Sequence, residues 1–273
     1  MNFADYIRGA GFRCADGAEV RIDRPYDTPL VLCGSGRTML SVADGVSVRI
    51  VLLPASGSES EVTIRLGAGA QADAVGWYDG CRSAVKLQQE AGSRFAMTAV
   101  VAGSAETSFA AGLDGAGAEY GFGGVFMAGA GDSPAVRMRV SHNAAGCRSE
   151  STVKGVASAD GRGRFEGLVY VAKDAQQTDA RQTSRNLLIG SEARITTLPQ
   201  LEIYADDVKC SHGATVGQMD ADAILYMRQR GINEAVARRL QVEGFIADVV
   251  MHCAVAEVGD ALLEALQERT DLL

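Results

Sequence analysis

The repeating unit of this chain is clearest at residues 67–75, GAGAQADAV, where a glycine-rich turn leads into alternating small or apolar and polar residues. The same pattern, a glycine-rich turn followed by alternating apolar and polar residues, recurs at several places between about residue 15 and residue 217. Turn glycines at positions 45, 69, 92 and 117 lie about 24 residues apart, and the step from 117 to 163 is about twice that. A period of this size is typical of a solenoid.

A mainly β fold, a parallel β-solenoid, explains this period better than a sandwich does. One coil of about 24 residues holds only a few short strands and cannot bury its apolar side alone, whereas stacked coils share a core. The chain has 32 Gly for the corners and only 5 Pro, which leaves its backbone donors available for pairing. A β-sandwich is the structural alternative because its strands also recur at short intervals.

Near Gly217 the pattern changes from short β segments with glycine-rich turns to a helical pattern, which predicts two domains. We expect a β-helix core over residues 1–217, with a short irregular N-terminal lead-in, and a helical domain over residues 218–273. Asp220 and Asn233 are candidate N-caps for two helices, and a third helix is predicted from about residue 260. These helices could cap the open end of the solenoid, dock a partner protein, or do both.

Composition and charge exclude several classes of function. The net charge is -8 and the pI about 5.0, so we expect no binding to nucleic acid or to an anionic membrane. The first residues lack the basic and apolar regions of a signal peptide, and no run of about 18 apolar residues occurs. We therefore expect a cytoplasmic protein whose six cysteines stay as thiols.

The most informative segment for chemistry is LEIYADDVKCSHG, residues 201–213. Cys210 and His212 are two apart, so on a strand both side chains leave the same face, about 7 Å apart at the backbone. A thiolate and an imidazole so placed could bind one soft or borderline metal, such as iron or zinc, with further ligands from elsewhere. Cysteine is also a common packing residue, so the residues alone leave both interpretations open.

Support for a catalytic constellation is poor: the three histidines leave a Ser/His/Asp arrangement open, but no catalytic residue is predicted. The chain lacks a G-x-S-x-G nucleophile elbow and a G-x-x-x-x-G-K-[ST] phosphate loop. Cys253 is expected in the core. Cys14, Cys33 and Cys81 are expected to be packing residues, and His142 and Cys147 have no companion ligands nearby in the sequence.

Three runs in the second half of the chain carry a resemblance: QTDA at 177–180, SRNLL at 184–188 and PQLEIYADDVKCSHGATVG at 199–217. They are similar to the SufB/SufD family of the bacterial SUF iron–sulfur cluster assembly machinery. The run DDVKCSHGAT at 206–215 points to its SufD-like members, and YMRQRGI at 226–232 continues the match. Strong similarity covers about residues 147–250, and the preceding half agrees only in texture.

This resemblance implies a right-handed parallel β-helix with a C-terminal helical domain. It implies a non-catalytic scaffold that pairs with a SufB-like subunit and docks a SufC-like ATPase, the expected site of ATP hydrolysis. It implies that Cys210 and His212 hold a transient iron–sulfur cluster together with the partner subunit. The docking residues would be Tyr226, Arg228, Arg230, Arg238 and Arg239.

The resemblance also sets expectations for the isolated chain. No cofactor is expected in it, and a homodimer is a candidate assembly. The chain is shorter than typical family members, so we expect most of their N-terminal helical region to be missing.

Two other functions compete with the scaffold. An exported β-helical protein that binds or degrades polysaccharide would need clustered carboxylates or basic residues on one face and an export signal. A structural solenoid, such as an adhesin fragment, would also need export and would make the cysteine–histidine pair incidental.

Overall fold

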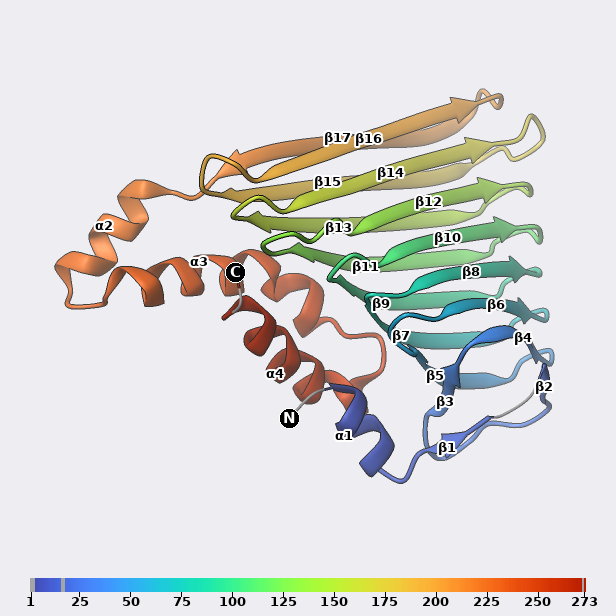
Figure 1. Ribbon diagram of the computed structural model, residues 1–273. Helices are drawn as coiled ribbons and strands as arrows, with labels where there is room; N and C mark the ends of the chain where they lie inside the picture. Colours follow the sequence, from blue (N-terminus) through green and yellow to red (C-terminus); the bar gives the residue numbers. More distant parts are fainter. Residues whose placement is uncertain (1–2, 16–17, 272) are drawn as a thin grey trace.

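The chain winds through two parallel sheets that face each other (Figure 1). In the computed structural model, which describes residues 3–15, 18–271 and 273, the strands alternate between a nine-stranded and an eight-stranded sheet. Each strand pairs in parallel with strands two steps away in the sequence, so successive coils stack. The predicted β-solenoid is confirmed, and the sandwich is excluded because a sandwich is built from antiparallel sheets.

The strands lengthen along the chain. The nine-stranded sheet holds β1 (Arg13–Cys14), β3 (Leu30–Gly34), β5 (Ser47–Pro54), β7 (Gln71–Asp79), β9 (Arg94–Ala102), β11 (Glu119–Ala128), β13 (Arg148–Ser158), β15 (Thr178–Ile189) and β17 (Val208–Gln218). The eight-stranded sheet holds β2 (Glu19–Ile22), β4 (Gly36–Val42), β6 (Glu59–Leu66), β8 (Arg82–Gln89), β10 (Glu106–Leu113), β12 (Ala135–His142), β14 (Arg162–Val171) and β16 (Arg194–Ile203). The solenoid therefore has a small N-terminal end and a large C-terminal end.

One corner of each coil is a tight turn whose central residue has a left-handed backbone. The predicted turn glycines at 45, 69, 92 and 117 all have φ between +63° and +70°. The next positions in this column are Gly146 and Gln177, because the amide of Gly117 bonds to Ala145 and that of Gly146 to Gln176. The expected continuation at position 163 is wrong, since Gly163 lies inside β14. The coils lengthen instead of keeping one period.

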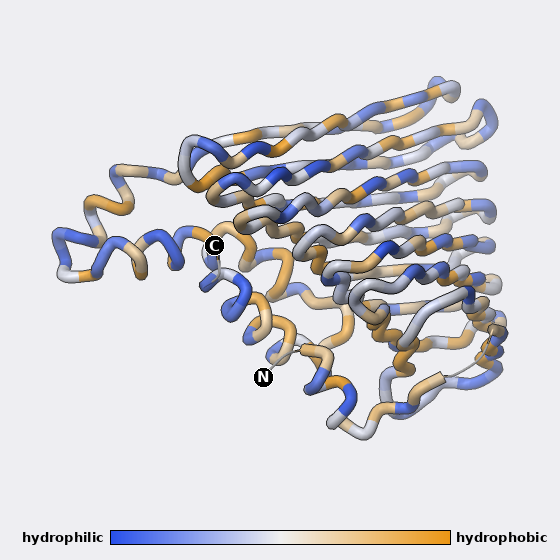
Figure 2. Tube along the Cα trace, viewed as in Figure 1, coloured by the Kyte–Doolittle hydropathy of each residue, from blue (hydrophilic) through white to orange (hydrophobic). Residues whose placement is uncertain are grey.

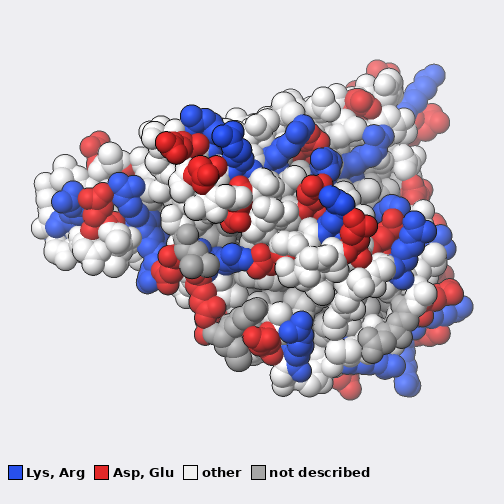
Figure 3. Space-filling model, in the orientation of Figure 1, with Lys and Arg blue, Asp and Glu red and all other residues white. Residues whose placement is uncertain are grey.

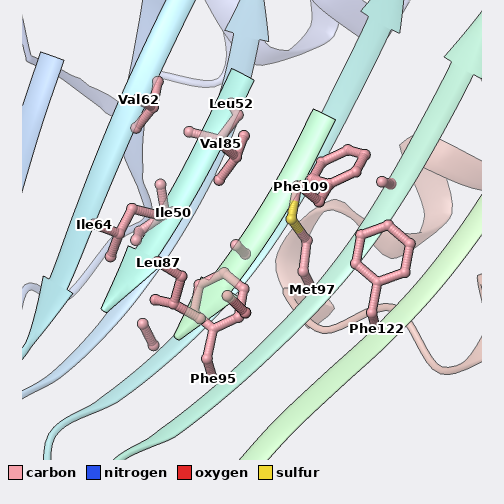
Figure 4. Close-up of a cluster of buried hydrophobic side chains, with 14 of the residues drawn as sticks. Ile50, Leu52, Val62, Ile64, Val85, Leu87, Phe95, Met97, Phe109 and Phe122 are labelled. Carbon is pink, nitrogen blue, oxygen red and sulfur yellow. The ribbon is translucent and has the colours of Figure 1, made fainter. Parts of the chain in front are cut away.

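The lumen between the two sheets is apolar for most of its length (Figure 4). Leu52, Ile64, Phe109 and Phe122 are among the side chains that fill it, and the rings of Phe109 and Phe122 lie 4.9 Å apart between centroids. Burial of each such side chain contributes about 1.5–3 kcal/mol. Figure 2 shows the alternation of hydropathy that directs one side of each strand inward.

The lumen becomes polar toward its C-terminal end. Tyr120 and Phe122 of β11 are followed in register by Ser149 and Ser151 of β13. Gln182 and Ser184 of β15 are also buried on this side. Gln182 and Ser184 lie directly beneath β17 of the last coil, and Ser149 and Ser151 lie one coil further away.

The predicted helices are present, and their caps are confirmed. Helix α2 (Ala221–Gln229) begins after Asp220, whose carboxylate accepts two backbone N–H groups at 3.0 Å. Helix α3 (Glu234–Met251) begins after Asn233, whose side chain accepts from the Val236 amide. A short 3₁₀ turn, η1 (Ala256–Val258), leads into α4 (Gly259–Thr270), close to the predicted start.

The helices cover the side of the solenoid, and they leave its open end bare. Apolar side chains of α3 and α4 pack on the outer face of the nine-stranded sheet in one cluster with Val75, Val100 and Val125. Residues 3–9, expected to be irregular, form helix α1 (Phe3–Gly9) in the same cluster, with Phe3 against Trp77. The interpretation of the helices as an end cap is therefore wrong.

Among the described residues, ion pairs fasten the helical layer to the solenoid. They are Lys154–Asp248, Arg49–Glu257 and Arg269–Asp79. No helix in the described part of the chain is long and apolar enough to span a membrane.

A candidate metal centre at the open end of the solenoid

The last coil presents two long strands with an uncovered edge. Strands β16 and β17 end their sheets, and within the described chain each has a hydrogen-bonded neighbour on one side only. The opposite end differs, because β1 and β2 span only two and four residues. Short edge strands limit pairing with other chains, whereas long exposed edges favour it.

Cys210 and His212 lie on the lumen side of β17. Cys210 pairs in register with Ala180, and His212 pairs with Gln182. The Cys210 side chain is half-buried against the small cluster that contains Ala180 and Ala205, while His212 is exposed. The strand therefore places the thiol and the imidazole on one face, as the spacing predicts, at the mouth of the lumen.

The Cys210 thiol is protonated at neutral pH. Burial raises its pKa, the Asp179 carboxylate raises it further, and a backbone hydrogen bond at Ala180 opposes the change. Metal binding needs the thiolate, so a metal must displace this proton, and its affinity should rise with pH.

Two donors do not complete a metal site. Among the described residues, no group of three or more His, Cys, Asp or Glu side chains could hold a metal ion. The sulfur and nitrogen donors of Cys210 and His212 suit iron or zinc, and the bare end leaves room for ligands from another molecule. The arrangement fits a centre that a second protein or sulfide must complete.

Exposed apolar side chains lie on the last coil, on or directly after the strands β16 and β17. Tyr204 and Val216 are 61% and 45% exposed, and Leu198 and Ile203 are also exposed. The Tyr204 ring lies 5.7 Å from that of Tyr170 between centroids, which holds it at the edge of the last coil. Aromatic and aliphatic groups around a polar centre are typical of a protein interface.

Sequence reasoning missed Gln182, which lies directly beneath His212. It is buried, and its position 30 residues before His212, one coil earlier, was the only signal in the sequence. Such a signal cannot be used before the register is known, because the coil length changes along the chain.

The predicted docking residues lie together on an arm formed by α2 and α3, which projects from the solenoid (Figure 1). Arg230 covers the exposed Tyr226 ring at 4.5 Å, and Arg228 and Arg238 both pair with Glu234. Arg239 pairs with Glu243 and Asp271. These are exposed ion pairs that contribute up to about 1 kcal/mol each and can exchange partners at little cost.

The arm combines these charges with apolar groups. Leu225, Val236 and Leu240 are exposed on α2 and α3. In Figure 3 acidic and basic side chains alternate over the arm, so it has no single-sign field. Its chemistry suits a protein surface with mixed charge and an apolar centre.

The remaining cysteines divide into two groups. Cys81 is buried and Cys253 is half-buried, as expected. Cys14 and Cys33 are exposed, with their sulfur atoms 4.0 Å apart, so their assignment as packing residues is wrong. The reason is that β1 is a two-residue edge strand and, among the described residues, no further coil covers it.

The carboxylates on the outer face of the eight-stranded sheet do not form a catalytic cluster. Arg82 pairs with Glu59 and Glu106, and Arg137 pairs with Glu106 and Glu166. This ladder of alternating charge neutralises the carboxylates, and it gives no support to the polysaccharide-degrading alternative.

Comparison with known proteins matches the chain to one family. The family model described as SUF system FeS cluster assembly, SufBD core domain, matches residues 36–245. The iron-sulfur cluster assembly protein SufD of Escherichia coli (strain K12) is 48% identical over 113 residues, which are 41% of this chain and 27% of that protein. The SufD protein of Bacillus subtilis (strain 168) is 33% identical over 105 residues, 38% of this chain and 24% of that protein.

A more distant relative matches over a longer stretch. An iron-sulfur cluster assembly SufBD family protein of Mycobacterium leprae (strain TN) is 31% identical over 152 residues, 53% of this chain and 39% of that protein. The chain thus spans from about a quarter to two-fifths of the length of these relatives.

Proposed function

Because the chain belongs to the SufBD core family of the SUF iron–sulfur cluster assembly system, we propose that it is a SufD-like scaffold subunit. The observation that carries this proposal is the open end of the solenoid. Within the described chain, this end has two long strand edges without a neighbouring strand and a rim of exposed apolar side chains. It also holds Cys210 and His212, which together supply two metal ligands and leave the metal site incomplete.

The partner at this end is a SufB-like subunit. Its own edge strands would extend both sheets across the interface, and its side chains or sulfide would complete the coordination. The nascent cluster is the cargo of this interface. Cys210 and His212 each supply one ligand, and the Cys210 proton leaves as the metal binds.

The arm formed by α2 and α3 is the docking surface for a SufC-like ATPase. Tyr226, Arg228, Arg230, Arg238 and Arg239 would contact it, with acidic groups of the ATPase replacing Glu234 and Asp271 as arginine partners. ATP hydrolysis belongs to that partner, and this chain acts as a non-catalytic scaffold in the cytoplasm. Because α3 is fastened to β13 through Lys154, movement of the arm would reach the solenoid.

The test is co-expression with SufB-like and SufC-like partners, followed by anaerobic cluster reconstitution. The His212→Ala variant should co-purify with both partners but lose the visible absorbance of the cluster. His252→Ala is the matched control, because His252 is exposed and, within the described part of the chain, its side chain bonds to the Asp248 carbonyl alone. Normal cluster formation by His212→Ala would overturn the site assignment.

Two further variants separate the two interfaces. Val216→Glu should remove the SufB-like subunit and leave the ATPase bound, because it places a charge in the apolar rim of the open end. Tyr226→Glu should do the reverse. Loss of both partners from either variant, with the fold intact, would contradict the division of surfaces.

A further inference from the structure

Cys14 and Cys33 form a pair of exposed thiols at the small N-terminal end of the solenoid. Cys14 is the last residue of β1, Cys33 lies on the neighbouring strand β3, and their sulfur atoms are 4.0 Å apart. Strands β1 and β17 are the two edges of the nine-stranded sheet, so this pair lies at the opposite end from Cys210 and His212. The proposed cluster scaffold makes no use of it.

The two thiols share one face of the sheet but are offset along it. Cys14 pairs in register with Val31, and Cys33 lies two residues further along β3, so both side chains leave the same face as Val31. A strand spacing of about 4.8 Å and an advance of about 6.6 Å over two residues place their Cα atoms about 8 Å apart. A disulfide requires Cα atoms within about 7 Å of each other. The backbone would therefore have to move before these sulfurs could form a disulfide.

The separation of the sulfur atoms fits a bridging metal ion. Two thiolate sulfurs that each lie about 2.3 Å from one metal ion are about 3.8 Å apart at a tetrahedral angle and about 4.6 Å apart in a linear arrangement. The observed 4.0 Å falls within this range. Binding of a metal ion therefore needs only small rotations of the two side chains.

The number of ligands selects the kind of metal. In the part of the chain that the structure describes, no third His, Cys, Asp or Glu side chain joins this pair to complete a larger metal-binding group. A structural zinc site takes four protein ligands, whereas the soft ion Cu(I) prefers thiolates and is held by two of them. The pair therefore suits a soft ion of low coordination number.

We propose that Cys14 and Cys33 bind one soft metal ion of the Cu(I) type and thereby link β1 to β3. Each thiol releases its proton as the sulfur binds the metal, so the affinity rises with pH. Because β1 pairs with β3 through only two residues, the metal bridge reinforces the shortest strand pairing of the nine-stranded sheet. This site is separate from the candidate cluster site and does not depend on the proposed function.

The test is an anaerobic titration of the full chain with Cu(I) in competition with a chromogenic Cu(I) chelator. Every sample carries Cys210→Ser, because the half-buried thiol at the open end is a second possible copper ligand. We expect one Cu(I) per chain, with two sulfur neighbours in its X-ray absorption spectrum. Adding Cys14→Ser or Cys33→Ser should weaken binding more than about a hundredfold, since loss of a group that merely supports a metal ligand already costs about 10–100-fold.

Cys253→Ser is the matched control. The Cys253 thiol is half-buried and donates to the Val255 carbonyl, so this substitution should leave the Cu(I) affinity unchanged. Cys14 and Cys33 are exposed, so serine at either position should leave the thermal unfolding midpoint of the metal-free chain unchanged. Cys14→Ala repeats the test without a hydroxyl group at that position.

Two results would overturn the proposal. Equal Cu(I) affinity with and without Cys14→Ser would show that copper binds elsewhere on the chain. Weak copper binding together with rapid formation of a Cys14–Cys33 disulfide in glutathione disulfide would show that the pair is a redox pair and not a metal site. Neither result bears on the cluster site, because Cys210 is replaced in every sample.

Discussion

Lys154 of the solenoid contacts Asp248 of helix α3, and the two partners differ sharply in exposure. The Lys154 side chain is 7% exposed, whereas that of Asp248 is 56% exposed. The Lys154 ammonium group also donates to the Phe245 carbonyl and lies 4.9 Å from the Phe245 ring centroid. The buried Lys154 ammonium group thus makes three contacts with helix α3: the Asp248 carboxylate, the Phe245 carbonyl and the Phe245 ring.

The two partners of this ion pair should respond unequally to substitution. Asp248→Ala leaves a buried ammonium group without its counter-ion and should lower the free energy of unfolding by about 1–3 kcal/mol. Lys154→Met removes the charge and fills the space, so it should cost less. Urea unfolding of both variants measures the difference, and a larger loss in Lys154→Met would contradict it.

His142 makes stability depend on pH. Burial lowers its pKa to about 4, so the folded chain keeps the ring neutral down to that pH. The unfolded chain binds a proton at its ordinary value near 6.5, so acid favours unfolding between pH 6.5 and 4, by about 3 kcal/mol at most. Above pH 6.5 both states keep the ring neutral, so this destabilisation is absent, and below about pH 4 it is complete.

The comparison that isolates His142 is urea unfolding of the natural chain and of His142→Gln between about pH 7.5 and about pH 4.5. His142→Gln loses the bond to Ser149 and should be the less stable at neutral pH. Its deficit should shrink as the pH falls, because only the natural chain carries this penalty. Two parallel curves would show that His142 does not contribute.

At residues with a left-handed backbone, substitutions to and from glycine should change the stability of the fold in opposite directions. Ala159 is exposed with φ +50°, and Gly117 has φ +70° with open space where a Cβ atom would lie. Ala159→Gly should raise the free energy of unfolding by about 0.5–1 kcal/mol, and Gly117→Ala should lower it by about 1–2 kcal/mol. Thermal unfolding checks both, and shifts of the same sign would refute the explanation.

Alkylation should distinguish the two groups of cysteines. Burial raises the pKa of Cys81 to about 11, so at about pH 8 only about one thiol in a thousand is ionised. Cys14 is exposed and should react with iodoacetamide at least roughly tenfold faster in the folded chain. Peptide mapping by mass spectrometry measures both rates, and the ratio should collapse in urea.

Local signals predicted much of the fold. The glycines at 45, 69, 92 and 117 mark corners because a left-handed turn selects glycine. Asp220 and Asn233 mark helix starts because their side chains accept backbone N–H groups. The continuation of the turns failed at Gly146, which lies 29 residues after Gly117 because the coils lengthen. The position after it, Gln177, adopts the left-handed conformation without being glycine and so gives no compositional signal.

The candidate site was predictable only in part. The spacing of Cys210 and His212 places them on one face of a strand, and that needs no tertiary information. Three features of the site do require tertiary information. They are the register of His212 with Gln182, the uncovered last coil, and the packing of the helices on the side of the solenoid. Each depends on contacts between residues far apart in the sequence, which no local pattern records.

The unequal ends of the solenoid limit how the molecule can assemble. In the part of the chain that the structure describes, the edge strands of its narrow end are the short β1 and β2, and prolines at 25 and 29 follow them in the sequence. A molecule with long exposed strand edges at one end can pair through them with a single neighbour. The resulting pair then has no long exposed edge for further pairing. We therefore expect assembly through this end to stop at two molecules, without growth into fibres.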